Sequence, residues 1–171
     1  MNLRAEQLNS HPEQFEVLKH LEEILDRAGA DYEIITHPDS ILTAAEGVSQ
    51  GMGGLAEMAP SLILETEKGY IAAVISGATR LSYKKIKKAL GLKNISLATP
   101  EVVLKTTGAP VGSVSLVNLN IPTIIDERLE HFTAVYGGCG VPFHTLRISP
   151  SDLIKVTQAT VFDFSELKEI K

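Results

Sequence analysis

Two apolar runs separated by a short turn constrain the fold of this chain more than any other part of its sequence. Residues 61–65 and 70–75 are rich in β-branched and apolar side chains. The Thr66-Glu67-Lys68-Gly69 stretch between them is typical of a tight turn. This pattern predicts a β-hairpin near the middle of the chain, and the flanking sequence then decides which kind of sheet contains it.

Helical and strand signals alternate on both sides of this hairpin. Helices are predicted to start near Ser10, Thr43, Ser82, Thr99 and Ser149, with Glu13 and Glu46 completing capping boxes and with Gly29 and Gly91 as stops. Further short strands are predicted at 32–36, 95–98, 113–117, 122–125, 133–136, 144–148 and 160–164, the last at an edge. We therefore predict an α/β fold with a mixed, curved and partly barrel-like β-sheet flanked by helices.

Composition excludes several classes of protein. The single cysteine, Cys139, rules out an intrachain disulfide and a multi-thiolate metal site. The five histidines are scattered without i, i+4 pairing, so no metal and no cofactor are expected. No apolar run is long enough to span a bilayer and the N-terminus lacks a signal-peptide core, which predicts a soluble cytoplasmic protein without membrane contact.

Positive charge is concentrated in one segment of an otherwise acidic chain. The net charge is −5, yet residues 80–93 contain six basic and no acidic side chains. The predicted helix in this segment is a candidate for binding nucleic-acid phosphates, and a merely solvated helix surface is the alternative. The basic residues of this candidate site are Arg80, Lys84, Lys85, Lys87 and Lys88.

Several short motifs occur in a specific order along the chain. They are a His-Pro pair leading into a helix at 37–46, a hairpin that leads into the lysine-rich helix, a glycine loop at 107–115, and segments at 122–127, 135–140 and 146–153. This ordered set resembles the YbaK and prolyl-tRNA-synthetase-associated editing domains. The resemblance implies one domain over 1–171, with a family-like core at about 15–158, an N-terminal extension at 1–14, and a C-terminal strand and tail at 159–171.

The resemblance also implies an activity and its partners. It implies an aminoacyl-tRNA deacylase that hydrolyses the ester of a mischarged tRNA in trans, with a tRNA-Pro type substrate. The acceptor end of tRNA is the implied partner, with prolyl-tRNA synthetase as a second candidate. A catalytically degenerate paralogue, which binds tRNA, aminoacyl-adenosine or a synthetase without hydrolysis, is the alternative.

Candidate site residues follow from the glycine loops and the resemblance. The predicted catalytic set is Gly112, Gly137, Gly138 and His144, and the predicted substrate-binding set is Thr43, Ser115, Cys139 and Gly140. Glycine lets backbone N–H groups approach an oxyanion closely, although the same glycines could simply form turns. His144 could orient water or a ribose hydroxyl or could be structural, and Thr43 is also expected to cap a helix. For Cys139 a buried thiol is favoured over a nucleophile, and for His37 a structural role is favoured.

Two positions depart from the pattern of the family. Pro60 stands where relatives generally carry a lysine in an Ala-Lys-Thr/Ser-Leu motif, so the cation and a backbone donor are both missing. Ser115 is followed by Leu116-Val117-Asn118 rather than by a Pro-Phe-Gly type sequence. We therefore expect an altered pocket wall, and the amino-acid specificity of relatives is not carried over to this chain.

Overall fold

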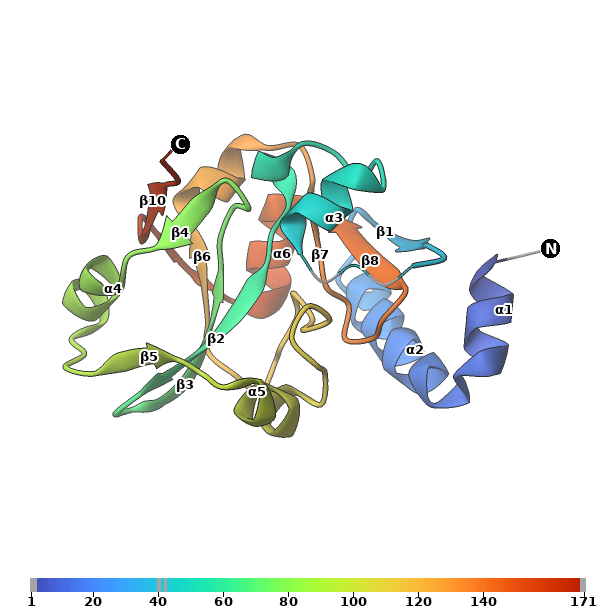
Figure 1. The fold of residues 1–171 in the computed structure, drawn as a ribbon, viewed down its shortest axis with the longest axis horizontal. Coiled ribbons are helices and arrows are strands. Elements are labelled where there is room, and N and C mark those ends of the chain that lie inside the picture. Colours follow the sequence, from blue (N-terminus) through green and yellow to red (C-terminus); the bar gives the residue numbers. More distant parts are fainter. Residues whose placement is uncertain (1–2, 40, 42, 170–171) are drawn as a thin grey trace.

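The computed structural model describes residues 3–39, 41 and 43–169 as a mixed α/β fold in which helices flank open sheets (Figure 1). The helices are α1 (Leu3–Ser10), α2 (Pro12–Arg27), α3 (Ala44–Ser49), α4 (Tyr83–Leu90), α5 (Pro100–Thr107) and α6 (Pro150–Thr157), with short 3-10 turns η1 (Leu55–Glu57) and η2 (Glu127–His131). The strands are β1 (Tyr32–Thr36), β2 (Ser61–Thr66), β3 (Gly69–Val74), β4 (Thr79–Leu81), β5 (Ile95–Leu97), β6 (Thr123–Asp126), β7 (Val135–Gly137), β8 (His144–Ile148), β9 (Thr160–Phe162) and β10 (Ser165–Leu167).

The strands form one large mixed sheet and two smaller ones. The large sheet has the order β5-β2-β3-β6-β9, with antiparallel pairing around the β2–β3 hairpin and parallel pairing of β3 with β6 and of β6 with β9. A second, antiparallel sheet has the order β1-β8-β7, and β4 pairs with β10. These pairings confirm the predicted hairpin and the mixed sheet with β9 at its edge. The sheets stay open, without the partial barrel closure that we had expected.

Alternating side chains of the large sheet pack against different helices on its two faces. On one face, Ile63 and Ala72 form a cluster with Val103 of α5. On the other face, Leu64 and Ala73 pack with buried Ile86 of α4. Because successive side chains of a strand point to opposite faces, α4 and α5 lie on opposite sides of this sheet.

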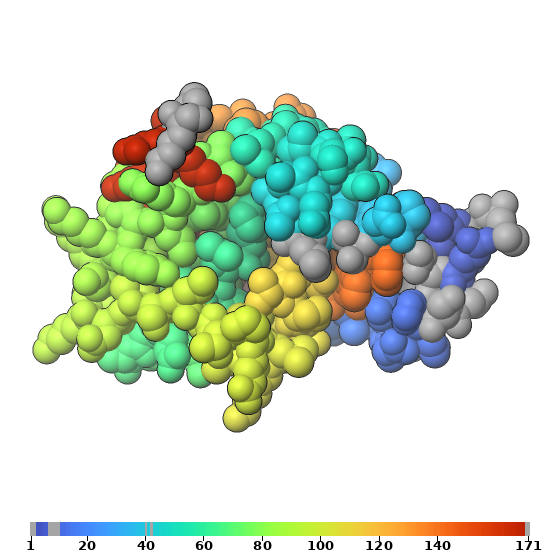
Figure 2. Space-filling model, viewed as in Figure 1, coloured from blue at the N-terminus to red at the C-terminus, as the bar shows by residue number. Residues whose placement is uncertain are grey.

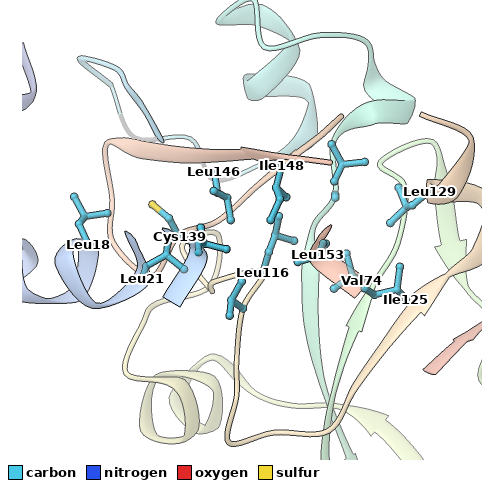
Figure 3. Packing of buried hydrophobic residues seen from close by; sticks show 14 of the residues in the cluster. Leu18, Leu21, Val74, Leu116, Ile125, Leu129, Cys139, Leu146, Ile148 and Leu153 are labelled. Atoms are coloured by element: carbon cyan, nitrogen blue, oxygen red, sulfur yellow. The ribbon is translucent and has the colours of Figure 1, made fainter. Parts of the chain in front are cut away.

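The largest hydrophobic cluster joins α2 to both main sheets. Figure 3 shows Leu18 and Leu21 of α2 beside Cys139 and Leu146, with Val74 and Ile125 of the large sheet farther along the same cluster. All of these side chains are buried, which ties the three-stranded sheet to the large one.

Local sequence signals explain most helix boundaries. The side chains of Ser82, Thr99 and Ser149 each accept a hydrogen bond from a backbone N–H in the first turn of α4, α5 and α6, as their N-cap positions predict. Gly91 ends α4 with φ +65°, a left-handed conformation that glycine adopts without steric cost.

The structure corrects two expectations about the secondary elements and adds one pairing that was not expected. The predicted strand at 113–117 is irregular, because the Ser115 hydroxyl accepts a hydrogen bond from the Val117 N–H and bends the chain. The first long helix, α2, begins at Pro12, with His11 and not Ser10 at its N-cap position, and the His11 side chain makes no capping hydrogen bond. The pairing of β4 with β10 was not predicted, since each has only three residues.

Candidate active site

A cavity of about 270 Å³ lies where the head of β2, helix α3 and two loops meet. Its walls come from the start of β2, the α3 region, the 111–114 loop and residues 136–145. In Figure 2 the cyan α3 segment and the yellow segment around residue 112 approach each other in the middle of the molecule. Most of the lining is apolar, including Met52, Met58, Ile63, Val103, Val114 and Val141.

Two histidines are buried in one wall of this cavity. His37 directly follows β1 and His144 begins β8, and each is 4% exposed. The antiparallel register places Thr36 opposite His144, which brings the imidazoles of His37 and His144 into the same region although they are far apart in sequence. The Phe143 carbonyl accepts a hydrogen bond from the His37 N–H at 2.9 Å, and Phe143 itself has a left-handed φ of +66°.

The side-chain nitrogens of these histidines differ in their partners. His37 Nε2 lies 3.0 Å from the Thr145 hydroxyl and its Nδ1 contacts the Asp39 carbonyl. His144 Nδ1 lies 3.1 Å from the Thr36 hydroxyl, whereas the buried Nε2 has no hydrogen-bond partner among the residues that the structure describes. A buried polar atom without a partner costs about 1–3 kcal/mol, so Nε2 would gain from a ligand hydroxyl or water.

Burial keeps both imidazoles neutral at neutral pH. Burial, together with smaller effects of the nearby His37 and Arg4, lowers the pKa of His144 to about 4. Burial likewise lowers the pKa of His37, against the opposing effects of the Asp39 carbonyl and carboxylate. Neutral imidazole can either donate or accept a hydrogen bond through Nε2, according to its tautomer.

The head of β2 contributes Pro60 and Ser61 to the cavity wall. The Pro60 carbonyl accepts a hydrogen bond from the Ile75 N–H at 3.3 Å, which fixes the start of the hairpin. Ser61 Oγ is buried and, within the described residues, has no partner. Thus the position that we compared with the lysine of relatives does face this pocket, and here it brings no charge.

Gly137 and Gly138 are needed for close packing around the cavity. A Cβ on Gly138 would lie 2.0 Å from the Val114 carbonyl oxygen, and one on Gly137 would lie 2.7 Å from the Ala59 carbonyl oxygen. Both glycines line the cavity together with Gly112, which has φ +92°. In the described part of the chain, the N–H groups of Gly112 and Gly138 have no acceptor, whereas the Gly140 N–H donates to the Ser113 carbonyl.

The predicted substrate-binding residues do not all lie at the cavity. Thr43 lines it and also caps α3, its hydroxyl accepting a hydrogen bond from the Glu46 N–H at 3.2 Å. Ser115, Cys139 and Gly140 are not among the residues that form its wall. Cys139 is 1% exposed in the core beside Leu18 and Leu21 (Figure 3), and burial raises the pKa of its thiol to about 12. A thiol with this pKa is a poor nucleophile at neutral pH.

The lysine-rich helix α4 packs on one face of the large sheet. The pocket residue Ile63 points to the opposite face, which α5 covers. Lys84 and Lys88 are exposed and Lys87 is half-buried. Lys85 binds Asp163 at 3.0 Å, and Arg80 contacts Glu166 at 3.3 Å. Lys85 is therefore held in a network that also contains Arg128, so it is less available than its neighbours to bind a ligand.

Sequence reasoning did not select Ser61, Thr145 or Tyr136, which also line the cavity, and it favoured a structural role for His37. The His37-Pro38 pair was visible in the sequence. Its proximity to Thr145 could not be read there, because it depends on the pairing of β1 with β8. In the described residues, no group of three His, Cys, Asp or Glu side chains is arranged to bind a metal, and no helix is long and apolar enough to cross a membrane.

The fold and cavity define a small mixed α/β domain with an apolar, histidine-bearing pocket at the junction of two sheets. This chain belongs to the aminoacyl-tRNA editing domain family, whose model matches residues 24–156. The expected resemblance to YbaK-type editing domains is thereby confirmed.

Three relatives place the chain within this family. It is 25% identical over 130 residues to a proline–tRNA ligase of Thermosipho melanesiensis, covering 74% of this chain but 23% of the ligase. Hypothetical protein APE2540 has a crystal structure that matches with a TM-score of 0.80 at 32% identity, covering 85% of this chain and 99% of that one. A protein proposed to be a trans-editing enzyme for prolyl-tRNA synthetase matches with a TM-score of 0.77 at 29% identity, covering 88% and 97%.

Proposed function

We propose that this chain is an aminoacyl-tRNA deacylase that hydrolyses the ester of a mischarged tRNA in trans, with a tRNA-Pro type substrate. The family supports the reaction class, and the similarity to a proposed trans-editing enzyme over 97% of that protein supports action as a separate domain. The observation that carries the proposal is the buried His144 Nε2, which lies in a pocket wall without a partner from the described residues.

The proposed reaction uses water as the nucleophile. Neutral His144 would bind the attacking water or a ribose hydroxyl through Nε2, since its Nδ1 is already beside Thr36. The N–H groups of Gly112 and Gly138 would bind the developing oxyanion, because within the described residues they have no competing acceptor. Gly137 would hold this loop against Ala59, and Thr43 would contact the amino acid at the mouth of the pocket.

A second candidate function is supported by Pro60. Without a cation at this position, the described residues of the pocket wall offer no charged group that could hold a phosphate or polarise the ester. A degenerate paralogue would keep the pocket and bind tRNA, aminoacyl-adenosine or prolyl-tRNA synthetase without hydrolysing an ester.

A deacylation assay separates these two functions. The purified chain is incubated with tRNA-Pro charged in turn with alanine, cysteine, serine or threonine, and ester loss is compared with the rate in buffer. We expect at least one ester to be lost faster than in buffer. Four rates equal to the buffer rate would reject the deacylase proposal for these substrates.

The alternative result is that all four rates equal the buffer rate while the chain still binds the charged tRNA tightly. This result would support the degenerate paralogue instead. Replacing Pro60 with lysine then tests the missing cation directly. A large gain of activity from near zero would favour the degenerate paralogue.

We also propose that Arg80 and the lysines of α4 bind tRNA phosphates. Neutralising the three less constrained lysines together (Lys84→Ala, Lys87→Ala and Lys88→Ala) should weaken tRNA binding. The slope of log K against log salt should fall by up to about 3, since each phosphate contact contributes about 0.9. Lys85 is left in place because its loss would break the contact with Asp163.

A matched triple variant controls for net charge in this binding experiment. Lys19, Lys105 and Lys155 are exposed on other helices, and their replacement by alanine removes the same three charges. We expect this variant to retain most of the affinity and nearly all of the salt slope. Equal weakening in both triple variants would mean that α4 makes no specific contact with tRNA.

A further inference from the structure

Among the described residues that line the cavity there is no aspartate, glutamate, lysine or arginine. Its side-chain polar groups belong to Thr43, Ser61, Ser113, Tyr136, Thr145 and the two histidines. A wall of this composition favours an uncharged group in the cavity over a charged one.

Glu46, Glu57 and Glu101 are adjacent in sequence to wall residues, but none of the three is among the residues that line the cavity, and Glu46 and Glu101 are exposed. Glu57 lies beside wall residue Met58, but its side chain accepts a hydrogen bond from the Gly54 N–H at 3.3 Å outside the cavity. Asp39 is exposed, and it contacts His37 through its backbone carbonyl. An α-ammonium group entering the cavity would thus lose water without gaining an anionic partner, and burying an unpaired charge is costly.

The histidines do not replace such a partner. His37 Nε2 and Nδ1 are already occupied by Thr145 and the Asp39 carbonyl, so of the ring nitrogens of these two histidines only His144 Nε2 lacks a partner among the described residues. Neutral imidazole, serine and threonine can all bind a neutral amine or a hydroxyl, as donor or as acceptor.

We propose that the cavity admits the acyl group of its substrate in uncharged form, with the α-amino group deprotonated or replaced by a hydroxyl. This inference rests on the proposed function, because it takes the acyl group of the tRNA ester as the occupant. It extends the substrate class to α-hydroxyacyl esters, in which a hydroxyl replaces the amine. The ester bond that breaks and the water that attacks are the same for both substrates.

Paired substrates test this inference. Alanyl-tRNA and lactyl-tRNA differ only in the amino group against the hydroxyl, and kcat/KM is measured for both from pH 5.5 to 8.5 after subtraction of buffer hydrolysis. The ratio of alanyl to lactyl kcat/KM cancels every titration of the protein that affects both substrates. It should fall about tenfold for each pH unit below the pKa of the substrate amine, which lies at about 7 to 8.

Two results would overturn the inference. One is a ratio that does not change with pH, and the other is a lactyl ester that is hydrolysed far more slowly than the alanyl ester at low pH. If neither ester is hydrolysed, the proposed function fails, and binding still tests the inference. Stable 3′-amide analogues of alanyl- and lactyl-adenosine are then titrated calorimetrically at pH 6 and pH 8.5.

In the binding form of the test, the inference expects the alanyl analogue to bind at least tenfold more weakly at pH 6 than at pH 8.5. The lactyl analogue should bind equally at both pH values. Lack of binding of both analogues, or equal pH dependence of both, contradicts the inference.

A charged variant of the wall provides the matched control. Pro60→Glu places a carboxylate at the head of β2, and Pro60→Gln places a neutral side chain of the same size there. The pH dependence of the alanyl-to-lactyl ratio should flatten in Pro60→Glu, because the carboxylate can pair with the ammonium. Pro60→Gln should keep the dependence of the unmodified protein, and flattening in both variants would mean that charge is not the cause.

Discussion

A Gly138→Ala variant is expected to lose about 3 kcal/mol of unfolding free energy, a large part of the stability of a domain of this size. The added Cβ would lie 2.0 Å from the Val114 carbonyl oxygen and 2.8 Å from its carbonyl carbon. Both atoms belong to backbone, so no flexible side chain can move away. Denaturant unfolding followed by far-UV circular dichroism measures the loss.

Gly108 offers a matched control for this substitution. It has φ +77° at the end of α5, and a Cβ there would meet no atom within 4 Å. Gly108→Ala should therefore cost only about 1–2 kcal/mol, the price of an alanine in the left-handed region. If Gly138→Ala is no more destabilising than Gly108→Ala, the result would contradict the close contact between Gly138 and the Val114 backbone.

A His144→Phe variant is expected to lower the deacylation rate by about 10²- to 10⁴-fold, the range typical for removal of a proton-transfer group. Phenylalanine fills the buried site but offers neither ring nitrogen. His144→Asn is the second variant, since it keeps a polar atom if the larger ring disturbs packing. Single-turnover deacylation measures the rate, and His131→Ala, an exposed histidine of η2, should remain fully active.

The pH dependence of the unfolding free energy tests whether the His144 imidazole is neutral in the folded protein. Because the pKa of His144 is about 4 in the folded chain and near 6.5 when unfolded, the unfolded state binds the proton first as pH falls. The unfolding free energy of the unmodified protein should therefore decrease between about pH 6.5 and pH 4. His144→Phe should remove part of this slope, leaving the part due to His37.

An unchanged slope in His144→Phe would show that His144 is not the group that burial holds neutral. Full deacylation activity in both His144 variants would contradict its proposed role in hydrolysis.

The local elements of this fold can be predicted from sequence because their signals are local. The caps at Ser82, Thr99 and Ser149 and the turn at 66–69 each depend on a few adjacent residues. The 113–117 segment misled the prediction because β-like composition says nothing about the Ser115 turn or about packing against Gly138.

The candidate site could be predicted only in part for the same reason. Five of the residues predicted from the sequence line one cavity, which is a necessary condition for a common site. They are Gly112, Gly137, Gly138, His144 and Thr43. Cys139 and Gly140 belong to the same loop but lie outside the cavity wall, in a stretch where Gly140 and Phe143 adopt left-handed conformations. Those dihedral angles, and the register that joins His37 to Thr145, are properties of tertiary structure.

The position of α4 across the sheet from the cavity has an evolutionary consequence. Ile86 anchors the helix on one face, while Ile63 and Val103 support the pocket on the other. If α4 binds tRNA as proposed, substitutions of its outer lysines would change how strongly the tRNA is bound without moving the pocket walls. Substitutions such as proline at position 60 can change the pocket without altering capture, so duplicated copies of this domain can diverge in the two properties independently.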